Sequence, residues 1–149
     1  MGDIDNIILG RGLEMIPFGC SPDSVRELLG NPDSSNTDGG DTLLEYDSLG
    51  LCFTFWGDYN NRLGYIGTER QGACLNGVRL IGQAMGEIIS YVEGSLVATP
   101  TEMEGCEHDD GRIQEWFDVD SLNLTFWFMD GDLYSIDWTC PWASEEAPW

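Results

Sequence analysis

The pair Cys106 and His108, two residues apart in a polar segment, is the best candidate for nucleophilic chemistry in this sequence. A reactive thiol needs an electropositive setting that favours the thiolate. The segment around Cys106 is instead rich in carboxylates, which raise the pKa of a thiol. The sequence has no Gly-x-Ser-x-Gly motif and no phosphate-binding glycine loop. We therefore predict that the protein is not an enzyme. The alternative is a small enzyme that uses the Cys106/His108 loop.

Three cysteines and the single histidine form the best candidate metal set, namely Cys74, Cys106, His108 and Cys140. Thiolates and imidazole are the ligands that zinc prefers. None of these residues has the Cys-x-x-Cys spacing that is typical of a zinc site. We expect no metal and no other cofactor, and we interpret the cysteines as free, mostly buried thiols. A metal-binding protein that uses the Cys106/His108 loop stays an alternative.

The charge of the chain is extreme for a folded domain. The 149 residues include 27 acidic and six basic side chains, all six arginine, for a formal net charge of −21. Binding to a phosphate backbone or to an anionic membrane surface needs clusters of Lys and Arg, so neither nucleic acid nor a membrane is a predicted partner. Self-repulsion of this size destabilises a compact state. The physical uses of such a charge are steering toward a basic partner, mimicry of nucleic acid, or solubility in a high-salt cytoplasm.

The compartment follows from the first residues and from the cysteines. The start of the chain has no basic region followed by a long apolar stretch, so we expect no signal peptide. No apolar run approaches the ~20 residues of a membrane helix. Five cysteines are an odd number, unlike the framework of a secreted disulfide-rich domain. We predict a cytoplasmic protein.

Two helices and six strands are expected. Ser21, Pro22 and Asp23 are typical of a helix start, which predicts a helix over 21–30, and an apolar stripe at helical spacing predicts a second over 81–93. Polar composition predicts a loop over 34–41 and an acidic connection over 99–111. The expected strands cover 42–46, 51–56, 62–68, 112–119, 122–129 and 133–139, and the Asp130-Gly131 pair predicts a hairpin between the last two.

An internal repeat is visible in the strands. Residues 47–55 align with 120–128 and share Asp, Ser, two Leu and two Phe in register. We predict an α+β fold in which two helix-plus-three-strand pseudo-repeats share a twisted antiparallel sheet with both helices on one face. The predicted single domain covers 1–149, with pseudo-repeats at about 9–70 and 77–140 and a short acidic C-terminal tail.

The segment 16–33 carries a family resemblance. It reads Ile-Pro-Phe-Gly-Cys-Ser-Pro-Asp-Ser-Val at 16–25 and Leu-Leu-Gly-Asn-Pro-Asp at 28–33. This pattern resembles the opening of small outer-membrane assembly lipoproteins of the SmpA/OmlA type and of the tandem-repeat fold of β-lactamase-inhibitor proteins. It is also similar to immunity proteins of bacterial toxin systems. The resemblance implies a tandem-repeat fold and a role in neutralising a toxin. Unlike the lipoproteins, this chain has no lipobox.

The aromatic residues divide into a core set and a surface set. Phe53, Phe55, Phe126 and Phe128 share one parity in their strands, so we expect them in the core, and Trp127 should point to the other face. Exposed Trp residues among carboxylates are typical of a protein-docking surface. The predicted partner-binding residues are Glu102, Glu104, Glu107, Asp109, Asp110, Trp116, Asp118, Asp120 and Trp127.

These observations together predict a non-enzymatic, acidic, protein-binding inhibitor. The most concrete form is a cytoplasmic immunity protein that neutralises a basic toxin or effector, because opposite charges accelerate the encounter of the two proteins. Besides the enzyme and the metal-binding protein, an acidic adaptor or chaperone is a further alternative.

Overall fold

The computed structural model describes residues 4–141, which form two β-sheets and two α-helices. The larger sheet has the strand order β3–β4–β5–β6–β12–β11–β10–β9, and all its neighbouring strands are antiparallel. Its strands are β3 (Ser34–Asp38), β4 (Asp41–Tyr46), β5 (Leu51–Trp56), β6 (Arg62–Thr68), β9 (Glu104–Glu107), β10 (Ile113–Val119), β11 (Leu124–Met129) and β12 (Asp132–Thr139).

A smaller sheet and the helices complete the fold. The smaller sheet has the order β2–β1–β7–β8 and consists of β1 (Asn6–Ile8), β2 (Gly12–Leu13), β7 (Cys74–Leu75) and β8 (Val78–Arg79). The helices are α1 (Pro22–Leu29) and α2 (Met85–Gly94), and single 3₁₀ turns follow β5 at η1 (Gly57–Tyr59) and β10 at η2 (Asp120–Leu122). In residues 4–141 no helix is long and apolar enough to cross a membrane.

The predicted α+β fold of two helix-plus-three-strand pseudo-repeats is wrong. The described chain is mostly β: eight antiparallel strands form one sheet, four short strands form a second, and there are only two α-helices. The boundaries of about 9–70 and 77–140 for the two pseudo-repeats stay a prediction. The predicted acidic C-terminal tail lies outside the described residues.

The missed strands of the larger sheet lie at its two edges. The predicted loop over 34–41 contains β3, and the predicted connection over 99–111 contains β9. Both strands are exposed and polar, so they lack the alternation that marks a half-buried strand, and backbone pairing to β4 and β10 holds them in place. Gly39 and Gly40 both have positive φ, which a two-residue hairpin turn between β3 and β4 requires.

The predicted second helix begins four residues too early. The segment before α2 runs beside the turn between β11 and β12, where Gly82 N donates to Leu133 O and Met85 N donates to Gly131 O. Gly82 has φ +93°, which interrupts any helix at that point. Ile81 is buried, as its apolar character predicts, but it packs from a turn ahead of α2 and not from a helix. The hairpin at Asp130-Gly131 is confirmed by the pairing of Met129 with Asp132.

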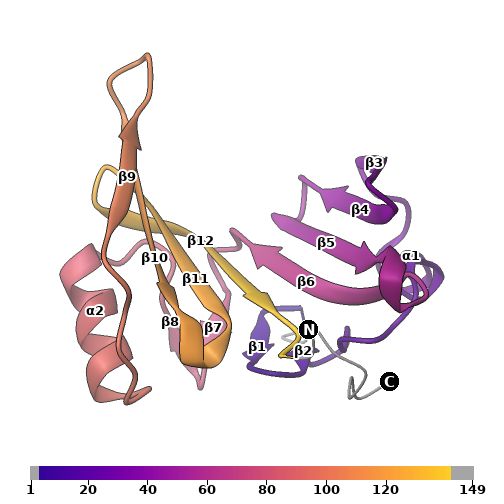
Figure 1. Ribbon diagram of the computed structural model, residues 1–149, viewed down its shortest axis with the longest axis horizontal. Coiled ribbons are helices and arrows are strands. Elements are labelled where there is room, and N and C mark those ends of the chain that lie inside the picture. The colour runs from indigo at the N-terminus through magenta and orange to yellow at the C-terminus, as the bar shows by residue number, and fades with distance from the viewer. Residues whose placement is uncertain (1–3, 142–149) are drawn as a thin grey trace.

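The hydrophobic core covers one face of the larger sheet. Phe53, Phe55, Phe126 and Phe128 are fully buried, as predicted. Buried residues of α1, α2 and the smaller sheet belong to the same core, so these elements lie against that face. Figure 1 shows the larger sheet as a curved layer, with the smaller sheet below its middle, α2 beside β9 and β10, and α1 near the opposite end. Within residues 4–141, no helix covers the other face, which we call the open face.

The Arg70–Asp5 ion pair connects the end of β6 to the N-terminal segment. Arg70 Nε lies 2.5 Å from Asp5 Oδ1, and Arg70 Nη1 donates to Leu49 O at 2.9 Å. Both side chains are about three-quarters shielded from solvent, with 24% and 21% exposed. Hydrogen bonds of a charged group in such a setting stabilise more than those of an exposed pair.

We predict that Arg70→Met lowers the free energy of unfolding by about 2 kcal/mol, because methionine keeps the packing of the side-chain stem and removes the hydrogen bonds. Urea unfolding followed by circular dichroism measures the change. Arg112→Met is the matched control, since the Arg112–Asp110 pair is more than half exposed. Equal losses in the two variants would contradict this assignment.

Candidate functional site

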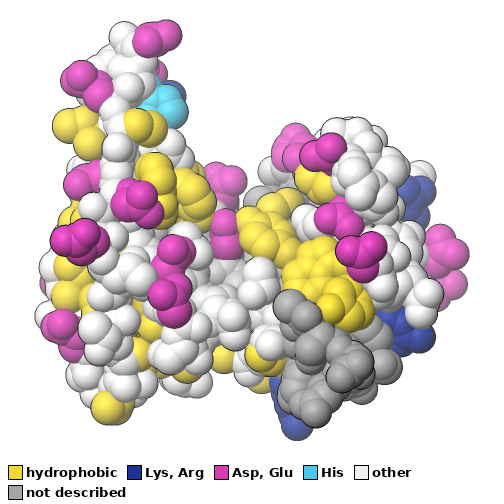
Figure 2. All heavy atoms as spheres, viewed as in Figure 1, with side chains coloured by type: hydrophobic (Ala, Val, Ile, Leu, Met, Phe, Trp, Pro, Cys, Tyr) yellow, Lys and Arg dark blue, Asp and Glu magenta, His cyan; other side chains and the backbone are white. Residues whose placement is uncertain are grey.

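A row of small and acidic side chains crosses the open face. Residues directly opposite each other on antiparallel strands share a face. From β4 to β10 the register aligns Glu45, Cys52, Gly67, Asp137, Thr125 and Asp118. Figure 2 shows a hollow between the arm of β9 and β10 and the lobe of β3 to β5, with acidic and hydrophobic side chains around it. The arginine side chains visible in that view lie at the margins of the molecule.

Asp137 lies at the centre of this row and is held by neutral donors. Trp127 Nε1 donates to Asp137 Oδ2 at 2.8 Å, and the side chains of Tyr65 and Ser135 also donate to this carboxylate. Burial raises the pKa of Asp137 above its ordinary value, and the three hydrogen bonds oppose that shift only in part. The two ion pairs within residues 4–141 involve Asp5 and Asp110, so neither neutralises Asp137.

Gly67 makes room for the Asp137 carboxylate. A Cβ atom at this position would lie 2.8 Å from Asp137 Oδ1 and 2.8 Å from Cys52 Sγ. Both neighbouring side chains therefore extend over the backbone of β6, which a larger residue would prevent. The absence of a side chain at Gly67 places a carboxylate and a thiol side by side in the middle of the sheet.

Two recesses flank the Asp137–Gly67 pair. The first, which we call the acidic recess, has a volume of about 370 Å³ and contains three carboxylates; its lining is Glu45, Asp47, Gly50, Leu51, Cys52, Gly67, Glu69 and Ser135. The second, the aromatic recess, has a volume of about 410 Å³ and also contains three carboxylates; its lining is Tyr65, Asp118, Asp120, Asn123, Leu124, Thr125, Trp127, Asp137, Trp138 and Thr139. Among the described residues, no arginine lines either recess.

The carboxylates of the open face repel one another. The pKa of Glu69 is raised by burial and then by the nearby charges of Asp137 and Asp47. Burial, together with the charge of Asp137, raises the pKa of Cys52 to about 12. A thiol with that pKa is protonated at neutral pH and is a poor nucleophile. The electrostatics of this face therefore favour a cation.

Aromatic rings form the second component of the face. Trp116 and Trp127 pair across β10 and β11, with ring centroids 5.1 Å apart and planes tilted by 32°. Both are half-buried, so they are less exposed than predicted. Trp56 lies across Gly64, whose Cβ would overlap the indole ring. Flat rings beside carboxylates are suited to cation–π contacts.

The structure brings only part of the predicted partner-binding set together. Asp118, Asp120 and Trp127 line the aromatic recess, and Trp116 pairs with Trp127 beside it. Glu104 lies opposite Trp116 and shares the open face. Their role in binding a partner stays a prediction.

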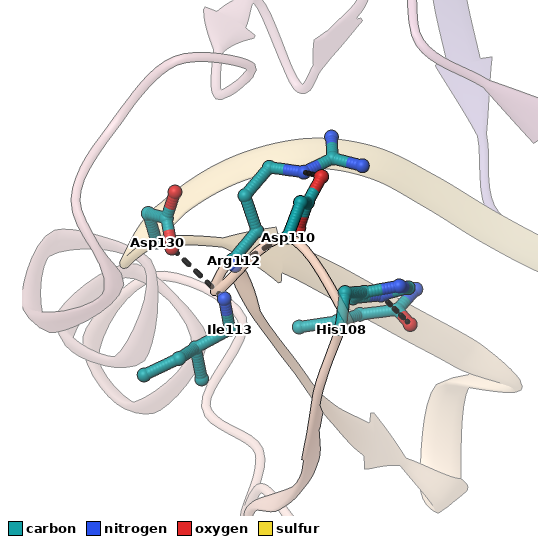
Figure 3. Close-up of polar contacts among 6 residues, drawn as sticks. His108, Asp110, Arg112, Ile113 and Asp130 are labelled. Atoms are coloured by element: carbon teal, nitrogen blue, oxygen red, sulfur yellow. Dashed lines mark hydrogen bonds and ion pairs between the residues drawn. The ribbon is translucent and has the colours of Figure 1, made fainter.

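The other predicted residues lie along the arm. Glu102 precedes β9 and is exposed, and Glu107 lies opposite Ile113, which places it on the other face of the sheet. Figure 3 shows the end of the arm, where Asp110 accepts from Arg112 at 2.7 Å and Asp130 accepts from Ile113 N at 2.9 Å. Asp109 and Asp110 belong to the exposed hairpin between β9 and β10, separate from the recesses, whereas Asp130 lies in the turn between β11 and β12.

The Cys106/His108 loop is organised by Gln114. His108 Nε2 lies 3.1 Å from Gln114 Oε1, and Cys106 Sγ lies 3.7 Å from the same oxygen. Gln114 Nε2 in turn donates to the hydroxyl of Tyr134. Within residues 4–141, no group of three or more His, Cys, Asp or Glu side chains is arranged to hold a metal ion.

Asp137, Tyr65 and Gly67 were not among the predicted site residues. Asp137 lies between Ile136 and Trp138, which are both buried, so strand alternation alone places it on the face opposite the core. That signal was available in the sequence. The approach of Tyr65 from β6 depends on the pairing of β6 with β12, which joins distant parts of the chain.

Comparisons with known proteins identify no family. No protein-family model matches the chain, and no curated protein matches it significantly. Among solved structures, an extracellular protein containing an SCP domain from Bacillus anthracis is similar, with a TM-score of 0.48 and 9% sequence identity over 85% of this chain. The match covers 44% of that protein, so this chain spans less than half of its length.

We predict that Asp137→Asn raises the free energy of unfolding at neutral pH. The folded-state pKa of Asp137 is raised, so the carboxyl group favours folding when protonated and loses that contribution as the pH rises through its folded-state pKa. The neutral amide avoids this loss. The advantage of the variant should shrink as the pH falls toward 3.8, the ordinary pKa of aspartate.

Thermal unfolding over a pH series measures this difference. Glu93→Gln is the control, because Glu93 is exposed on α2 and far from the row of carboxylates. A wild-type protein that is more stable than Asp137→Asn at neutral pH would show that the three hydrogen bonds outweigh the burial of the charge.

Proposed function

We propose that this protein is a non-enzymatic acidic inhibitor that binds a basic protein with its open face. In its most concrete form it is a cytoplasmic immunity protein that neutralises a basic toxin or effector. The observation that carries the proposal is the pair of recesses, each with three carboxylates and, among the described residues, no arginine in its lining. A cationic partner would supply the positive charge that the described lining residues of the two recesses do not contain.

The energetics of association support this function. The net charge of −21 attracts a basic partner over long range and accelerates the encounter. Carboxylates in a hollow are less screened by salt than those on a convex surface. Half-buried Trp side chains provide apolar contact area, which typically dominates the stability of a complex. Fast association and slow dissociation suit an antidote that must bind before its target acts.

Affinity capture with matched variants tests the proposal. The wild type, the double variant Asp118→Asn/Asp137→Asn and the double control Glu27→Gln/Glu93→Gln are immobilised and exposed to a lysate of the source organism. The control acids lie exposed on α1 and α2. We expect one basic protein to be captured by the wild type and the control, to be released by salt, and to be lost in the Asp118/Asp137 variant. The activity of the captured protein should fall when the wild type is added.

A partner that binds the wild type and both double variants equally would show that the contact lies outside the region of Asp118 and Asp137. A captured protein whose activity is unchanged by binding would favour an adaptor or chaperone role over inhibition.

For the same complex, we predict that acidic and aromatic residues control different rate constants. Removing Glu107 and Asp109 on the arm should lower the association rate at low salt and have little effect at high salt, because exposed charges are screened within about 8 Å at physiological salt. Trp116→Ala and Trp127→Ala should each weaken binding by about 2 kcal/mol, mainly through faster dissociation. Stopped-flow and surface-binding kinetics measure both rates. If the association rate changes neither with salt nor on removal of the arm acids, the charge serves only to keep the protein soluble.

A further inference from the structure

The aromatic recess has the features of a receptor for one cationic side chain. Asp137 accepts hydrogen bonds from the side chains of Trp127 on β11, Tyr65 on β6 and Ser135 on β12, which fix its orientation. All three donors are neutral, so the charge of Asp137 is oriented without being compensated. A carboxylate has about four lone-pair sites for hydrogen bonds, and these donors occupy three.

A second carboxylate is positioned on the other side of the recess. Asp118 Oδ1 accepts from Thr125 Oγ1 at 2.6 Å, and Asp118 N donates to Thr101 Oγ1 at 2.9 Å. Thr125 lies between Asp118 and Asp137 in the cross-strand row, so the two carboxylates flank it on neighbouring strands. A ligand over Thr125 would lie between two negative charges.

Aromatic rings give the aromatic recess flat walls. The rings of Trp127 and Tyr65 line it, and Trp116 extends the Trp127 surface toward β9. A planar guanidinium stacks on such rings and donates to two carboxylates at once, and it is more weakly hydrated than an ammonium group. The ammonium group of lysine is compact and strongly hydrated, so it stacks less well on the aromatic rings and spans the two carboxylates less well than a guanidinium does.

We propose that the aromatic recess binds the guanidinium of an arginine side chain of the basic partner, between Asp137 and Asp118 and against Trp127. This inference rests on the proposed function and adds a specific chemistry to it. The acidic recess, in contrast, is lined by no aromatic residue of the described chain and supplies general attraction for positive charge.

Two peptides of equal charge test the inference. Acetylated hexa-arginine amide and hexa-lysine amide are titrated into the protein of 149 residues at low and high NaCl, and tryptophan fluorescence and calorimetry report binding. We expect hexa-arginine to bind about tenfold more tightly than hexa-lysine, with the ratio preserved at high salt.

Variants of the recess residues show whether the preference for arginine over lysine arises in the aromatic recess. Asp137→Asn and Trp127→Leu should each reduce the ratio toward one, and the exposed controls Glu27→Gln and Glu93→Gln should keep it. Trp127→Phe retains a ring but not the Nε1 donor, and should give an intermediate ratio. Circular dichroism and thermal unfolding establish that each variant is folded, and Asp137→Asn gives a result even where Trp127→Leu does not fold.

Each outcome has a defined meaning. Equal affinities of the two peptides for the wild type would overturn the arginine recess and leave the proposed function intact. A preference for arginine that survives in Asp137→Asn would place the recognition outside this recess. Failure of both peptides to bind would overturn the recess and the proposed function together.

Discussion

The close approach of Asp137 and Gly67 at the junction of β6 and β12 is the constraint on which the open face depends. These two strands join the halves of the larger sheet, and only glycine leaves room there for the Asp137 carboxylate and the Cys52 thiol. With the carboxylate in that position, Trp127 and Tyr65 can donate to it from the neighbouring strands. The two recesses lie on either side of this contact, so a side chain at position 67 would change both.

The fold accommodates the carboxylates of the open face because the hydrophobic core that stabilises it lies on the other face of the larger sheet. The phenylalanine residues of β5 and β11, with apolar residues of both helices and the smaller sheet, form one continuous core below the sheet. Apolar burial of this kind is insensitive to charge, so the carboxylates can concentrate on the other face. Burial raises the pKa of Asp137, and burial followed by the charges of Asp137 and Asp47 raises the pKa of Glu69, so ionising these groups has an energetic cost. A bound cation would remove part of that cost, which links the electrostatics of the free protein to the proposed function.

Sequence patterns predicted the parts of the structure that depend on local chemistry. The cap at Ser21, the hairpin at Asp130-Gly131 and the buried parity of Phe126 follow from neighbouring residues, and the structure confirms them. The edge strands β3 and β9 were missed because backbone pairing alone holds them. The smaller sheet was missed because its short strands join residues 6–13 to residues 74–79.

The candidate site likewise contains some residues that the sequence predicted and others that only the folded structure identifies. Trp116 and Trp127 were selected as aromatic residues among carboxylates, and Asp118 and Asp120 because they follow the acidic connection closely in the sequence. Asp137 was not selected: its alternation with Ile136 and Trp138 indicates only the face of the strand, and the register of the folded sheet is what places it opposite Gly67 and Thr125. Burial and the field of neighbouring charges, which separate Asp137 from the other carboxylates, are properties of the folded chain.

The most direct test of the account is to observe where a cationic probe binds. Nitrogen–proton correlation spectra of the labelled protein, recorded during addition of hexa-arginine amide, report every backbone amide and each tryptophan Nε1–H. We predict that the Trp127 Nε1–H signal and the amides around Tyr65, Thr125 and Asp137 shift together and saturate. Shifts confined to the arm around Asp109 and Asp110, or spread evenly over all acidic surfaces, would contradict a binding site on the open face.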